Sequence, residues 1–498
     1  MTSRLLISTA LLSLSLTPFA IARDLQPKPS DPFFEKYEGL AAPAPAVKLQ
    51  KGDKLAICGD SITEQKMYSR LIETYLTACV PQLKVTCRQY GWSGEQASGF
   101  AGRMKNDVLR FQPTVATTCY GMNDHRYVPY TDAIGAEYVK NQTETVRQFK
   151  ETGVRVVLGS PGTIGLMPAW VKTATGTKED LNLSLLRLRN HDVQIAEEMG
   201  VRFADVYWPM LTAGFTAQQK FGPEFMMTGK DGVHPGWAGQ TVMAYAFLKA
   251  LGLDGEIGTL TWDAAGGTAT ASAGHEVVGA AEGGVKFKSS RYPFCVPEGD
   301  VKKDDSIQSA VALIPFHETL NRFTLVLKNA TAPRYEVTWG NTAKTFSTAD
   351  LTKGINLAAE FRDNPFSAPF EKVSKAVFAK QDYETRQIVI VAPTGSGKST
   401  LIKAAMGLLP LNSGWVKVFG EPVKKNLTRV GYVPQRESVD WDFPVSVMDV
   451  VLMGRYGRLG LIKRPSKLDR DVARECLDKV KMLPYANRQI SNLSGGQQ

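Results

Sequence analysis

Four short blocks of polar residues in the first half of the chain carry the side chains that acyl transfer needs. The first is Gly59-Asp60-Ser61, which follows an apolar run and precedes a helical pattern, so Ser61 is predicted at a helix N-terminus. Unpaired N–H groups and the positive end of the helix dipole stabilise negative charge at such a position. A lone tripeptide of this kind more often only caps a helix. The interpretation therefore depends on the other blocks.

The remaining blocks supply hydrogen-bond donors and a base. Gly94 lies in WSGE, where a glycine lets a backbone N–H approach a ligand closely. Asn123 lies in GMND and can donate through its side-chain amide. In DGVHP, Asp231 stands three residues before His234, so its carboxylate can fix the tautomer of the ring while the other nitrogen accepts a proton from serine. The four blocks together predict a serine hydrolase.

These blocks occur in the order seen in SGNH hydrolases of the GDSL esterase/lipase group, and the resemblance covers Lys51 to Leu253. It implies a flavodoxin-like three-layer α/β/α fold and hydrolysis through a covalent acyl-enzyme, with no metal or cofactor. The implied roles are nucleophile for Ser61, general base and then acid for His234, orienting carboxylate for Asp231, and oxyanion donors for Ser61 N–H, Gly94 N–H and the Asn123 amide. A catalytically inactive relative is the alternative.

The motifs do not name the substrate. Six aromatic residues near the motif loops are candidates either for stacking on a sugar ring or for simple packing: Trp92, Tyr120, Tyr127, Tyr130, Trp170 and Trp237. We expect a small ester or an acylated carbohydrate carrying an O-acetyl or short acyl group. The other histidines, His125, His191, His275 and His317, are expected to be surface or core residues, with a position beside the pocket as the alternative for His125, two residues beyond Asn123.

A second chemical motif begins at Gln387, where QIVIVAPTGSGKST combines a predicted buried strand with a P-loop. Its glycines let successive N–H groups wrap phosphates, Lys398 can reach the β and γ phosphates, and the Ser399 hydroxyl can ligate Mg²⁺. Ala392 replaces the first glycine of the usual pattern. The predicted nucleotide-binding residues are Gly395, Ser396, Gly397, Lys398, Ser399 and Thr400.

Val433-Pro434-Gln435 and a final LSGGQ follow this P-loop, and the order resembles ABC transporter ATP-binding subunits, most closely the manganese/zinc importer group, over residues 387–498. The resemblance implies that Gln435 couples the metal and the γ-phosphate to a membrane partner. The family's acidic pair and switch histidine would follow LSGGQ, and the sequence ends before them. We therefore expect weak binding of ATP and Mg²⁺ at best, without turnover.

The elements that must position these residues alternate along the chain between apolar runs and helical patterns. Predicted strands are 54–58, 84–90, 114–121, 154–160 and 201–206, and predicted helices are 68–78, 137–150 and 185–199. This alternation favours a parallel sheet covered by helices. A β-rich extension over 254–386, with strands at 322–329 and 334–341, is expected to end in a helix over 368–383, and a partial P-loop NTPase α/β fragment over 387–498 to follow.

Residues 1–22 have the features of a secretory signal: Arg4, an apolar run from Leu5 to Phe19, and a small-residue cleavage pattern ending at Ala22. Residues 23–50, rich in proline, are predicted to be an extended linker. The expected location is secreted or periplasmic, which conflicts with the cytosolic site of an ABC ATPase. We therefore predict an exported esterase fused to an incomplete ABC module. The alternative is a metal-ion transporter subunit with an unusual N-terminal domain and a membrane permease partner.

Composition sets outer limits on these interpretations. A length of 498 residues corresponds to roughly three domains, and 43% hydrophobic with 22% charged residues excludes a disordered, collagenous or coiled-coil chain. The net charge of +10 comes mostly from residues 387–498, where the basic residues are scattered, so no nucleic-acid partner is predicted. Cys58 and Cys119 are predicted core residues, while a disulfide between Cys79 and Cys87 stays open.

Overall fold

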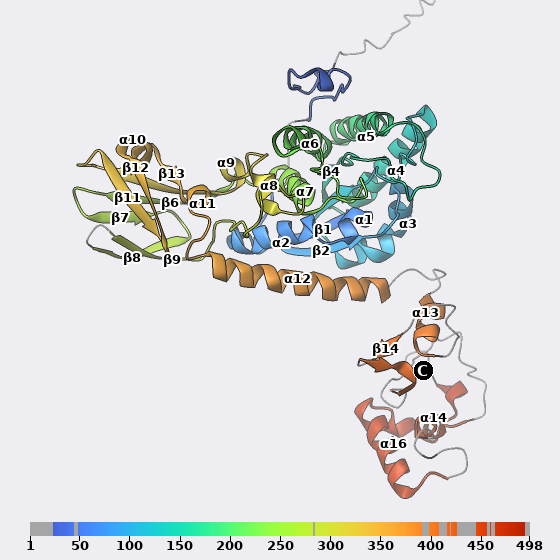
Figure 1. Ribbon diagram of the computed structural model, residues 1–498. Coiled ribbons are helices and arrows are strands. Elements are labelled where there is room, and N and C mark those ends of the chain that lie inside the picture. The colour runs from blue at the N-terminus through green and yellow to red at the C-terminus, as the bar shows by residue number, and fades with distance from the viewer. Residues whose placement is uncertain are drawn as a thin grey trace, which may run out of the picture. The chain divides into compact units, whose positions relative to one another are not determined.

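The computed structural model describes residues 23–43, 48–281, 284–390, 398–407, 416–418, 420–425, 445–455, 459 and 464–493. The chain divides into two compact units, Met1–Pro393 and Thr394–Gln498. Figure 1 shows the elements of both units coloured along the chain, and the predicted hydrolase motifs all belong to the first unit.

A five-stranded parallel sheet forms the centre of the first unit. Its strands are β1 (Lys54–Gly59), β2 (Thr86–Gly91), β3 (Val115–Cys119), β4 (Arg155–Gly159) and β5 (Arg202–Ala204). They lie in the order β2-β1-β3-β4-β5, which is the flavodoxin-like order. Gly59 pairs in register with Gly91 and with Cys119, so the carboxyl ends of β1, β2 and β3 meet at one edge. The predicted α/β fold is confirmed.

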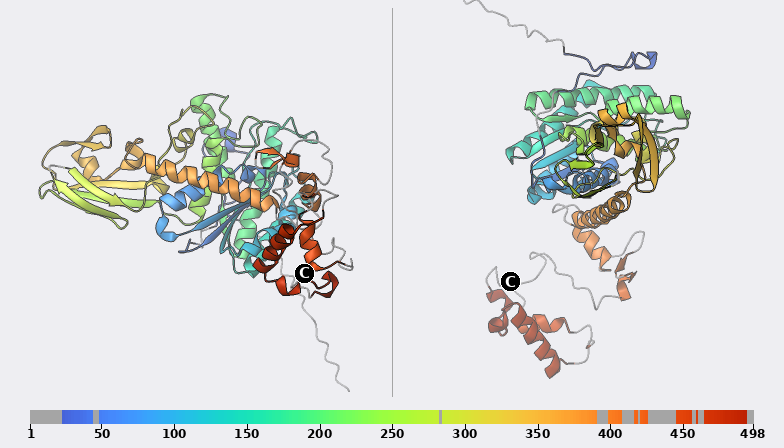
Figure 2. Two further views of the ribbon diagram at one scale, coloured as in Figure 1. Left: turned by 90° about the horizontal axis from the view of Figure 1, so that it is seen from below. Right: turned by 90° about the vertical axis from the view of Figure 1, so that its left-hand side faces the viewer.

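Helices cover both faces of this sheet (Figures 1 and 2). They are α1 (Ser61–Glu64), α2 (Tyr68–Ala78), α3 (Ala97–Asp107), α4 (Asp132–Glu151), α5 (Lys178–Met199), α6 (Tyr207–Phe221) and α7 (Trp237–Ala250). Alternate side chains of β1 point to opposite faces. Leu55 and Ile57 join a core cluster with α2 and α7, whereas Ala56 and Cys58 join a second cluster with α3 and α4. Both faces of a parallel sheet need such cover.

Three of these helices, α3, α6 and α7, have no counterpart among the predicted elements. Most residues of α7 are buried, including the polar Gln240 and Thr241, so the helix lacks the exposed polar face that reveals a helix in a sequence. α3 contains Gly99 and Gly102, which lower its helix propensity. α6 begins with Tyr207 and Trp208, residue types that are more typical of strands.

The segment predicted to be an extended linker, residues 23–50, is packed against the first unit over its described part. Phe34 and Tyr37 are buried, and the Phe34 ring meets Phe215 of α6 edge-on at 5.0 Å between centroids. Asn190 of α5 accepts a hydrogen bond from the backbone of this segment at 2.9 Å. The prolines predicted an extended linker, but the aromatic side chains between them bury enough apolar surface to hold the segment against the rest of the unit.

The cysteines are free thiols throughout. Cys58 and Cys119 are buried core residues, as predicted. Cys79 follows α2 directly and Cys87 lies on β2, and both are buried without forming the disulfide that one interpretation allowed. Their thiols pack as small apolar groups.

A β-rich extension follows Leu253, as the sequence predicted. Its main sheet has the order β13-β10-β6-β7, built from β6 (Glu256–Asp263), β7 (Thr268–Ala271), β10 (Arg322–Lys328) and β13 (Ile355–Asn356). Two hairpins accompany it, β8 (His275–Ala281) with β9 (Gly284–Ser289) and β11 (Arg334–Trp339) with β12 (Thr342–Ser347). The short helices are α8 (Ile307–Val311), α9 (Phe316–Leu320), α10 (Thr348–Lys353) and α11 (Leu357–Glu360). One apolar cluster includes Phe247 of α7, Phe316 and Phe323, so the extension shares a core with the α/β part.

A long helix, α12 (Ser367–Ile390), runs back from the extension along α2 and β2 (Figures 1 and 2). The buried Gln381 side chain accepts a hydrogen bond from Ser69 Oγ and donates one to Glu73 Oε2, each at 2.8 Å. Lys380 Nζ lies 2.7 Å from the other Glu73 oxygen. Because Ser69 and Glu73 belong to α2, α12 braces the helix that follows the serine motif.

The prediction of a strand from Gln387 is wrong for the described residues, because α12 continues to Ile390. The helix was predicted to end at Tyr383 and is therefore longer than expected. A strand needs neighbouring strands to satisfy its backbone groups, whereas a helix satisfies its own. No described strand pairs with residues 387–390.

The described part of the second unit is mostly helical. It contains α13 (Lys398–Ala405), a hairpin of β14 (Lys417–Val418) and β15 (Glu421–Pro422), α14 (Val447–Met453) and α16 (Lys467–Lys479). Ser446 and Ser466 cap α14 and α16, and Val447 packs with Leu477 in a small core. Among the described residues of the whole chain, no helix is long and apolar enough to cross a membrane.

Candidate active site

Ser61 lies at the carboxyl edge of the sheet, in the turn from β1 into α1. Asp60 caps α1, because its Oδ1 accepts the N–H of Ile62 at 3.0 Å. Gly59 leaves no room for a side chain, since a Cβ there would lie 2.0 Å from Thr63 Oγ1. The Gly-Asp-Ser sequence thus makes Ser61 the first residue of a helix.

Ser61, His234 and Asp231 form a hydrogen-bonded chain. Ser61 Oγ lies 2.8 Å from His234 Nε2, and His234 Nδ1 lies 2.6 Å from Asp231 Oδ2. Asp231 Oδ1 accepts the backbone N–H groups of Val233 at 3.0 Å and His234 at 2.9 Å. Burial raises the pKa of Asp231, but these backbone bonds and the imidazole outweigh it and hold the pKa below its usual value. The ionised carboxylate favours a proton on Nδ1, which leaves Nε2 to accept from serine.

Gly94 and Asn123 lie in the loops that follow β2 and β3. Gly94 has φ +71°, a conformation that favours glycine, and nothing lies within 4 Å of where its Cβ would be. Asn123 Nδ2 donates to the carbonyl of Glu95 at 3.1 Å, and the Tyr127 hydroxyl donates to Asn123 Oδ1 at 3.4 Å. Within the described residues, the backbone N–H groups of Ser61 and Gly94 have no acceptor. The five predicted hydrolase residues therefore gather at one edge of the sheet.

Two residues that the sequence analysis did not single out tie these loops together. Asp124 accepts the N–H groups of Ala97 at 2.9 Å and Gly121 at 3.0 Å, and burial raises its pKa to about 6. Gln96 Nε2 donates to the carbonyl of Asn123 at 3.0 Å. The role of Asp124 could have been predicted from the sequence, because an Asp beside a strand end commonly accepts backbone N–H groups. No feature of the sequence indicates the role of Gln96.

Gln240 of α7 connects the serine side of the site with the histidine side. Its Oε1 accepts the Tyr68 N–H at 3.1 Å, and its Nε2 donates to Gln65 Oε1 at 3.0 Å and to the Pro235 carbonyl at 3.3 Å. The side chain is completely buried. Since its partners on the serine side lie more than 170 residues earlier, no local pattern could have found it.

Two other ionisable groups lie beside the site in unusual environments. Burial raises the pKa of Asp60 to about 7, and the neighbouring carboxylates of Asp124 and Glu95 add to this shift. His125 is fully buried against Tyr127, with 4.6 Å between the ring centroids, and burial lowers its pKa to about 4. His125 is therefore a core residue, one of the positions that the sequence analysis allowed for it.

Of the six aromatic residues expected near the motif loops, Trp92 and Trp170 are strongly exposed, at 38% and 52%. Tyr120 and Tyr127 are buried, so they pack rather than face a ligand. The Trp170 ring lies 5.9 Å from the His234 ring, with 33° between the planes. Trp170 is thus in contact with the imidazole.

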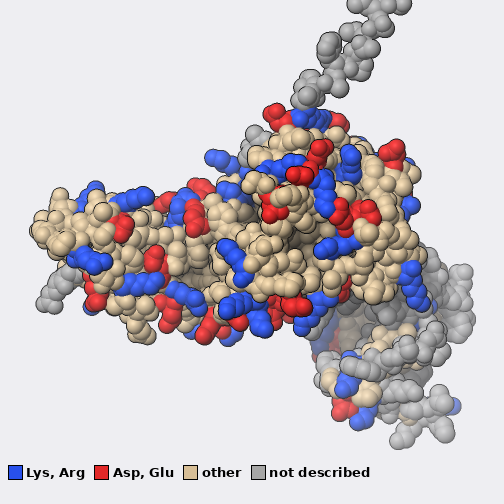
Figure 3. Space-filling model, turned by 45° about the horizontal axis from the view of Figure 1, so that its top comes forward, with Lys and Arg blue, Asp and Glu red and all other residues tan. Residues whose placement is uncertain are grey.

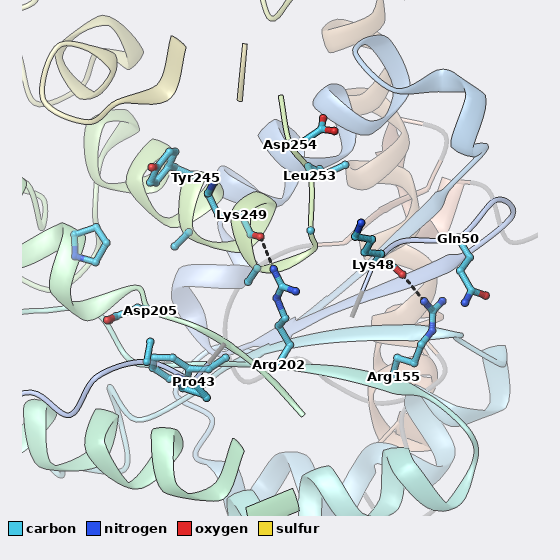
Figure 4. Close-up of a pocket in the computed structure, with 16 residues that line it drawn as sticks. Pro43, Lys48, Gln50, Arg155, Arg202, Asp205, Tyr245, Lys249, Leu253 and Asp254 are labelled. Carbon is cyan, nitrogen blue, oxygen red and sulfur yellow. Dashed lines mark hydrogen bonds between the residues drawn. The ribbon is translucent and has the colours of Figure 1, made fainter. Parts of the chain in front are cut away.

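The large hollow shown in Figure 4, of about 940 Å³, lies away from these residues. It is lined by Arg155 at the start of β4, Arg202 at the start of β5 and Lys249 near the end of α7. Arg155 Nη1 donates to the Lys48 carbonyl at 2.7 Å, and Arg202 Nη2 donates to the Lys249 carbonyl at 3.1 Å. The hollow therefore opens at the amino ends of the strands, opposite to Ser61.

The surface shows no concentration of one charge over the face in Figure 3, where basic and acidic side chains are interspersed. In the part of the chain that the structure describes, no group of three or more His, Cys, Asp or Glu side chains has the arrangement of a metal site.

The predicted nucleotide-binding residues divide into two groups. Gly395, Ser396, Gly397 and Gln435 lie outside the described residues, together with the last five residues of the chain. Lys398, Ser399 and Thr400 form the first turn of α13. Backbone N–H groups at the start of a helix are suited to binding phosphate.

Comparison with known proteins assigns the two motif regions to separate families. Residues 57–242 match the GDSL-like lipase/acylhydrolase family, and residues 382–498 match the ABC transporter family. The predicted resemblances are confirmed for both regions.

Curated relatives match the second region. The manganese transport system ATP-binding protein MntB of Bacillus subtilis (strain 168) is 60% identical over 115 residues, which are 23% of this chain and 46% of MntB. The zinc transport system ATP-binding protein TroB of Treponema pallidum (strain Nichols) is 62% identical over 109 residues, which are 22% of this chain and 41% of TroB. The chain spans less than half the length of these relatives.

A solved structure resembles the fold of the first region and its extension. It is that of a gut microbial diltiazem-metabolizing enzyme, with a TM-score of 0.58, 22% identity, and coverage of 89% of this chain and 97% of that chain. This coverage is far wider than residues 57–242, so the likeness in fold includes the β-rich extension.

Proposed function

Since the chain carries a GDSL-like lipase/acylhydrolase domain over residues 57–242 and an ABC transporter module over residues 382–498, we propose that its first unit is a serine ester hydrolase. The observation that carries this proposal is the chain of hydrogen bonds from Ser61 Oγ through His234 to Asp231. A hydroxyl, an imidazole and a carboxylate in this order activate a serine for attack on a carbonyl.

The reaction proceeds in two halves. Ser61 Oγ attacks the ester carbonyl carbon while its proton passes to His234 Nε2. The bond from that carbon to the alcohol oxygen then breaks, and His234 gives the proton to the leaving alcohol, which leaves the acyl group on Ser61. A water molecule, deprotonated by His234, attacks the acyl-enzyme and releases the carboxylic acid, and the proton returns to Ser61.

Negative charge on the carbonyl oxygen needs donors at the same edge of the sheet. The backbone N–H groups of Ser61 and Gly94, which have no acceptor within the described residues, and the side-chain amide of Asn123 are assigned this role. Preorganised donors of this kind stabilise the tetrahedral intermediate without reorganisation during the reaction. Asn123 is held for the purpose by its bonds with Glu95 and Tyr127.

The substrate in this proposal is a small ester with an O-acetyl or short acyl group, an acylated carbohydrate among them, and the hydrolase needs no cofactor. The functional regions are the hydrolase domain over residues 51–253, the β-rich extension over 254–386 and the ABC transporter module over 387–498. Residues 1–22 act as a secretory signal, which directs the hydrolase out of the cytosol.

A second function, as an ATP-binding subunit of a metal-ion transporter, is favoured by the 60% identity to MntB over 115 residues. Lys398, Ser399 and Thr400 would hold the phosphates of ATP and, through Ser399, Mg²⁺, and a membrane permease would be the partner. This function requires the protein to remain in the cytosol. The two functions therefore differ in location as well as in chemistry.

The test is hydrolysis of p-nitrophenyl acetate by the full chain and by a Ser61→Ala variant, with ATP hydrolysis measured on the same preparations and on Lys398→Ala. We expect ester hydrolysis that falls by about a thousandfold or more in Ser61→Ala. ATP turnover that depends on Lys398, without Ser61-dependent ester hydrolysis, would instead support the transporter function.

A further inference from the structure

The loop between β4 and α5 forms an apolar wall beside His234. Residues 164–171 read Ile-Gly-Leu-Met-Pro-Ala-Trp-Val, with no charged, hydroxyl or amide side chain among them. Leu166, Met167 and Trp170 are 44%, 36% and 52% exposed. Clustered apolar side chains at the surface mark a binding site more often than an isolated one does.

Hydrogen bonds anchor this wall to both sides of the proposed active site. Gly165 N–H donates to the carbonyl of Gly232, in the loop between Asp231 and His234, at 2.8 Å. A Cβ on Gly232, whose φ is +80°, would lie 2.6 Å from the Leu166 carbonyl oxygen, so the two loops pack backbone to backbone. Four residues beyond the other end of the wall, Thr175 N–H donates to the Tyr127 carbonyl at 3.0 Å.

Trp170 is the part of the wall that reaches the reacting groups. Its ring lies 5.9 Å from the His234 ring and 5.7 Å, edge-on, from the Tyr127 ring. Tyr127 in turn donates its hydroxyl to Asn123 Oδ1. The exposed indole is thus fixed between the imidazole and the residue that holds the Asn123 amide.

The position of Trp170 decides which half of the ester it meets. His234 gives its proton to the oxygen of the leaving alcohol, so that oxygen must come within hydrogen-bond distance of Nε2. A group attached to this oxygen lies against His234 and can extend over the adjoining indole. The wall therefore contacts the alcohol part of the bound ester.

The chemistry of the wall selects among alcohols. A sugar ring that stacks on an indole also needs hydrogen-bond donors and acceptors for its several hydroxyl groups, and the side chains of residues 164–171 offer one donor, the Trp170 indole N–H, and no acceptor. An apolar ring needs only the flat face of the indole, and the exposed Leu166 and Met167 side chains of the same loop add apolar surface. We propose that the hydrolase prefers esters whose alcohol carries an apolar ring, bound on Trp170. This inference rests on the proposed ester hydrolase function.

The test compares three acetate esters of primary alcohols on the full chain: benzyl acetate, butyl acetate and 6-O-acetylglucose. All three share the acyl group and a primary alcohol, so differences in kcat/KM report recognition of the alcohol. We expect benzyl acetate to be preferred by about fivefold to tenfold. Trp170→Ala should remove this preference and Trp170→Phe should retain it.

Phe111→Ala is the matched control, because Phe111 is an exposed aromatic residue, at 36%, just before the amino end of β3. It should leave the preference unchanged. Inhibition of the unaltered protein by benzyl alcohol, stronger than by butanol or glucose, provides a test that needs no variant.

Equal rates with the three esters, or a benzyl preference that survives in Trp170→Ala, would overturn this inference and leave the hydrolase function standing. A preference for 6-O-acetylglucose that Trp170→Ala removes would also overturn it, in favour of a sugar alcohol. Absence of Ser61-dependent hydrolysis with all three esters would overturn the proposed function and this inference with it.

Discussion

The two ends of the central sheet are both lined with polar side chains, yet they differ in what those side chains do. At the carboxyl ends, Ser61 Oγ and His234 Nε2 are 2.8 Å apart, although the two residues are separated by 173 positions in the sequence. At the amino ends, Arg155 and Arg202 line a hollow of about 940 Å³, and each donates to a backbone carbonyl.

This difference shows that the size of a hollow is a poor guide to chemistry. The amino-end guanidinium groups donate to backbone carbonyls of neighbouring segments and so help to hold those segments in place. The carboxyl-end groups form a chain that ends on a serine hydroxyl, beside N–H groups without an acceptor in the described residues. Substitutions at the two ends should therefore change different quantities: activity at one end and stability at the other.

The largest difference in kcat/KM is expected between substitutions of two carboxylates, one at each end of the sheet. Asp231→Asn should lower kcat/KM by about a thousandfold, because an amide cannot hold the Nδ1–H tautomer of His234 as a carboxylate does. Asp254→Asn, at the amino-end hollow, is the matched control and should change kcat/KM by less than about twofold. Equal losses in steady-state ester hydrolysis for the two variants would contradict the claim that only the carboxyl ends of the sheet carry the catalytic groups.

A smaller loss of activity is expected when the amide side chain of Asn123 is removed, and an amide at the other end of the sheet provides the control. Asn123→Ala removes one proposed oxyanion donor and should lower kcat by about a hundredfold, with little change in KM. Gln50→Ala, which alters an amide at the amino-end hollow (Figure 4), should leave both constants unchanged. An increase in KM alone for Asn123→Ala would mean that Asn123 binds the substrate without stabilising the transition state.

At the amino ends the expected effect is on stability. Arg155→Met leaves the buried carboxylate of Asp53 without its guanidinium partner and should lower the free energy of unfolding by about 2 to 3 kcal/mol. Urea unfolding measures this loss, and kcat/KM of the folded variant should stay unchanged. Reduced activity in a variant with normal stability would instead give the amino-end hollow a part in catalysis.

The smallest effect concerns pH and Asp60. Burial raises the pKa of Asp60 to about 7 in the folded state, above its usual value near 3.9. Between these values the folded state binds the proton more tightly, so this group's stabilising contribution is present at low pH and is lost as pH rises through about 7.

Asp60→Asn keeps an N-cap side chain and removes this titration. Relative to the unaltered protein, the variant should gain on the order of 1 to 2 kcal/mol of stability at pH 8 compared with pH 4.5. Urea midpoints at the two pH values measure the gain. A pH-independent difference between the two proteins would contradict the raised pKa.

Much of the site could be predicted because parallel strands end at one edge. The runs before Ser61, Gly94 and Asn123 were readable as strands, and β1, β2 and β3 do meet at that edge. The proximity of Asp231 to His234 followed from their spacing of three residues alone.

The supports of the site could not be predicted, because they depend on packing between distant segments. Gln240 bonds with residues more than 170 positions away, and Gln381 of α12 reaches back 312 positions to Ser69. α7, which carries Gln240, lacks a polar face and gives no helical periodicity. The prediction for residues 387–390 was wrong for the opposite reason, because a sequence typical of a strand continues a helix there.

The most direct test of the account is covalent trapping with a fluorophosphonate, followed by intact-mass measurement and peptide mapping. The reagent reacts with a serine whose hydroxyl is activated by a neighbouring base. We predict one adduct per chain, located on Ser61, absent in Ser61→Ala and formed more slowly in Asp231→Asn. No adduct, or an adduct on another serine with Ser61 unmodified, would contradict the assignment of Ser61, His234 and Asp231 as the hydrolytic centre.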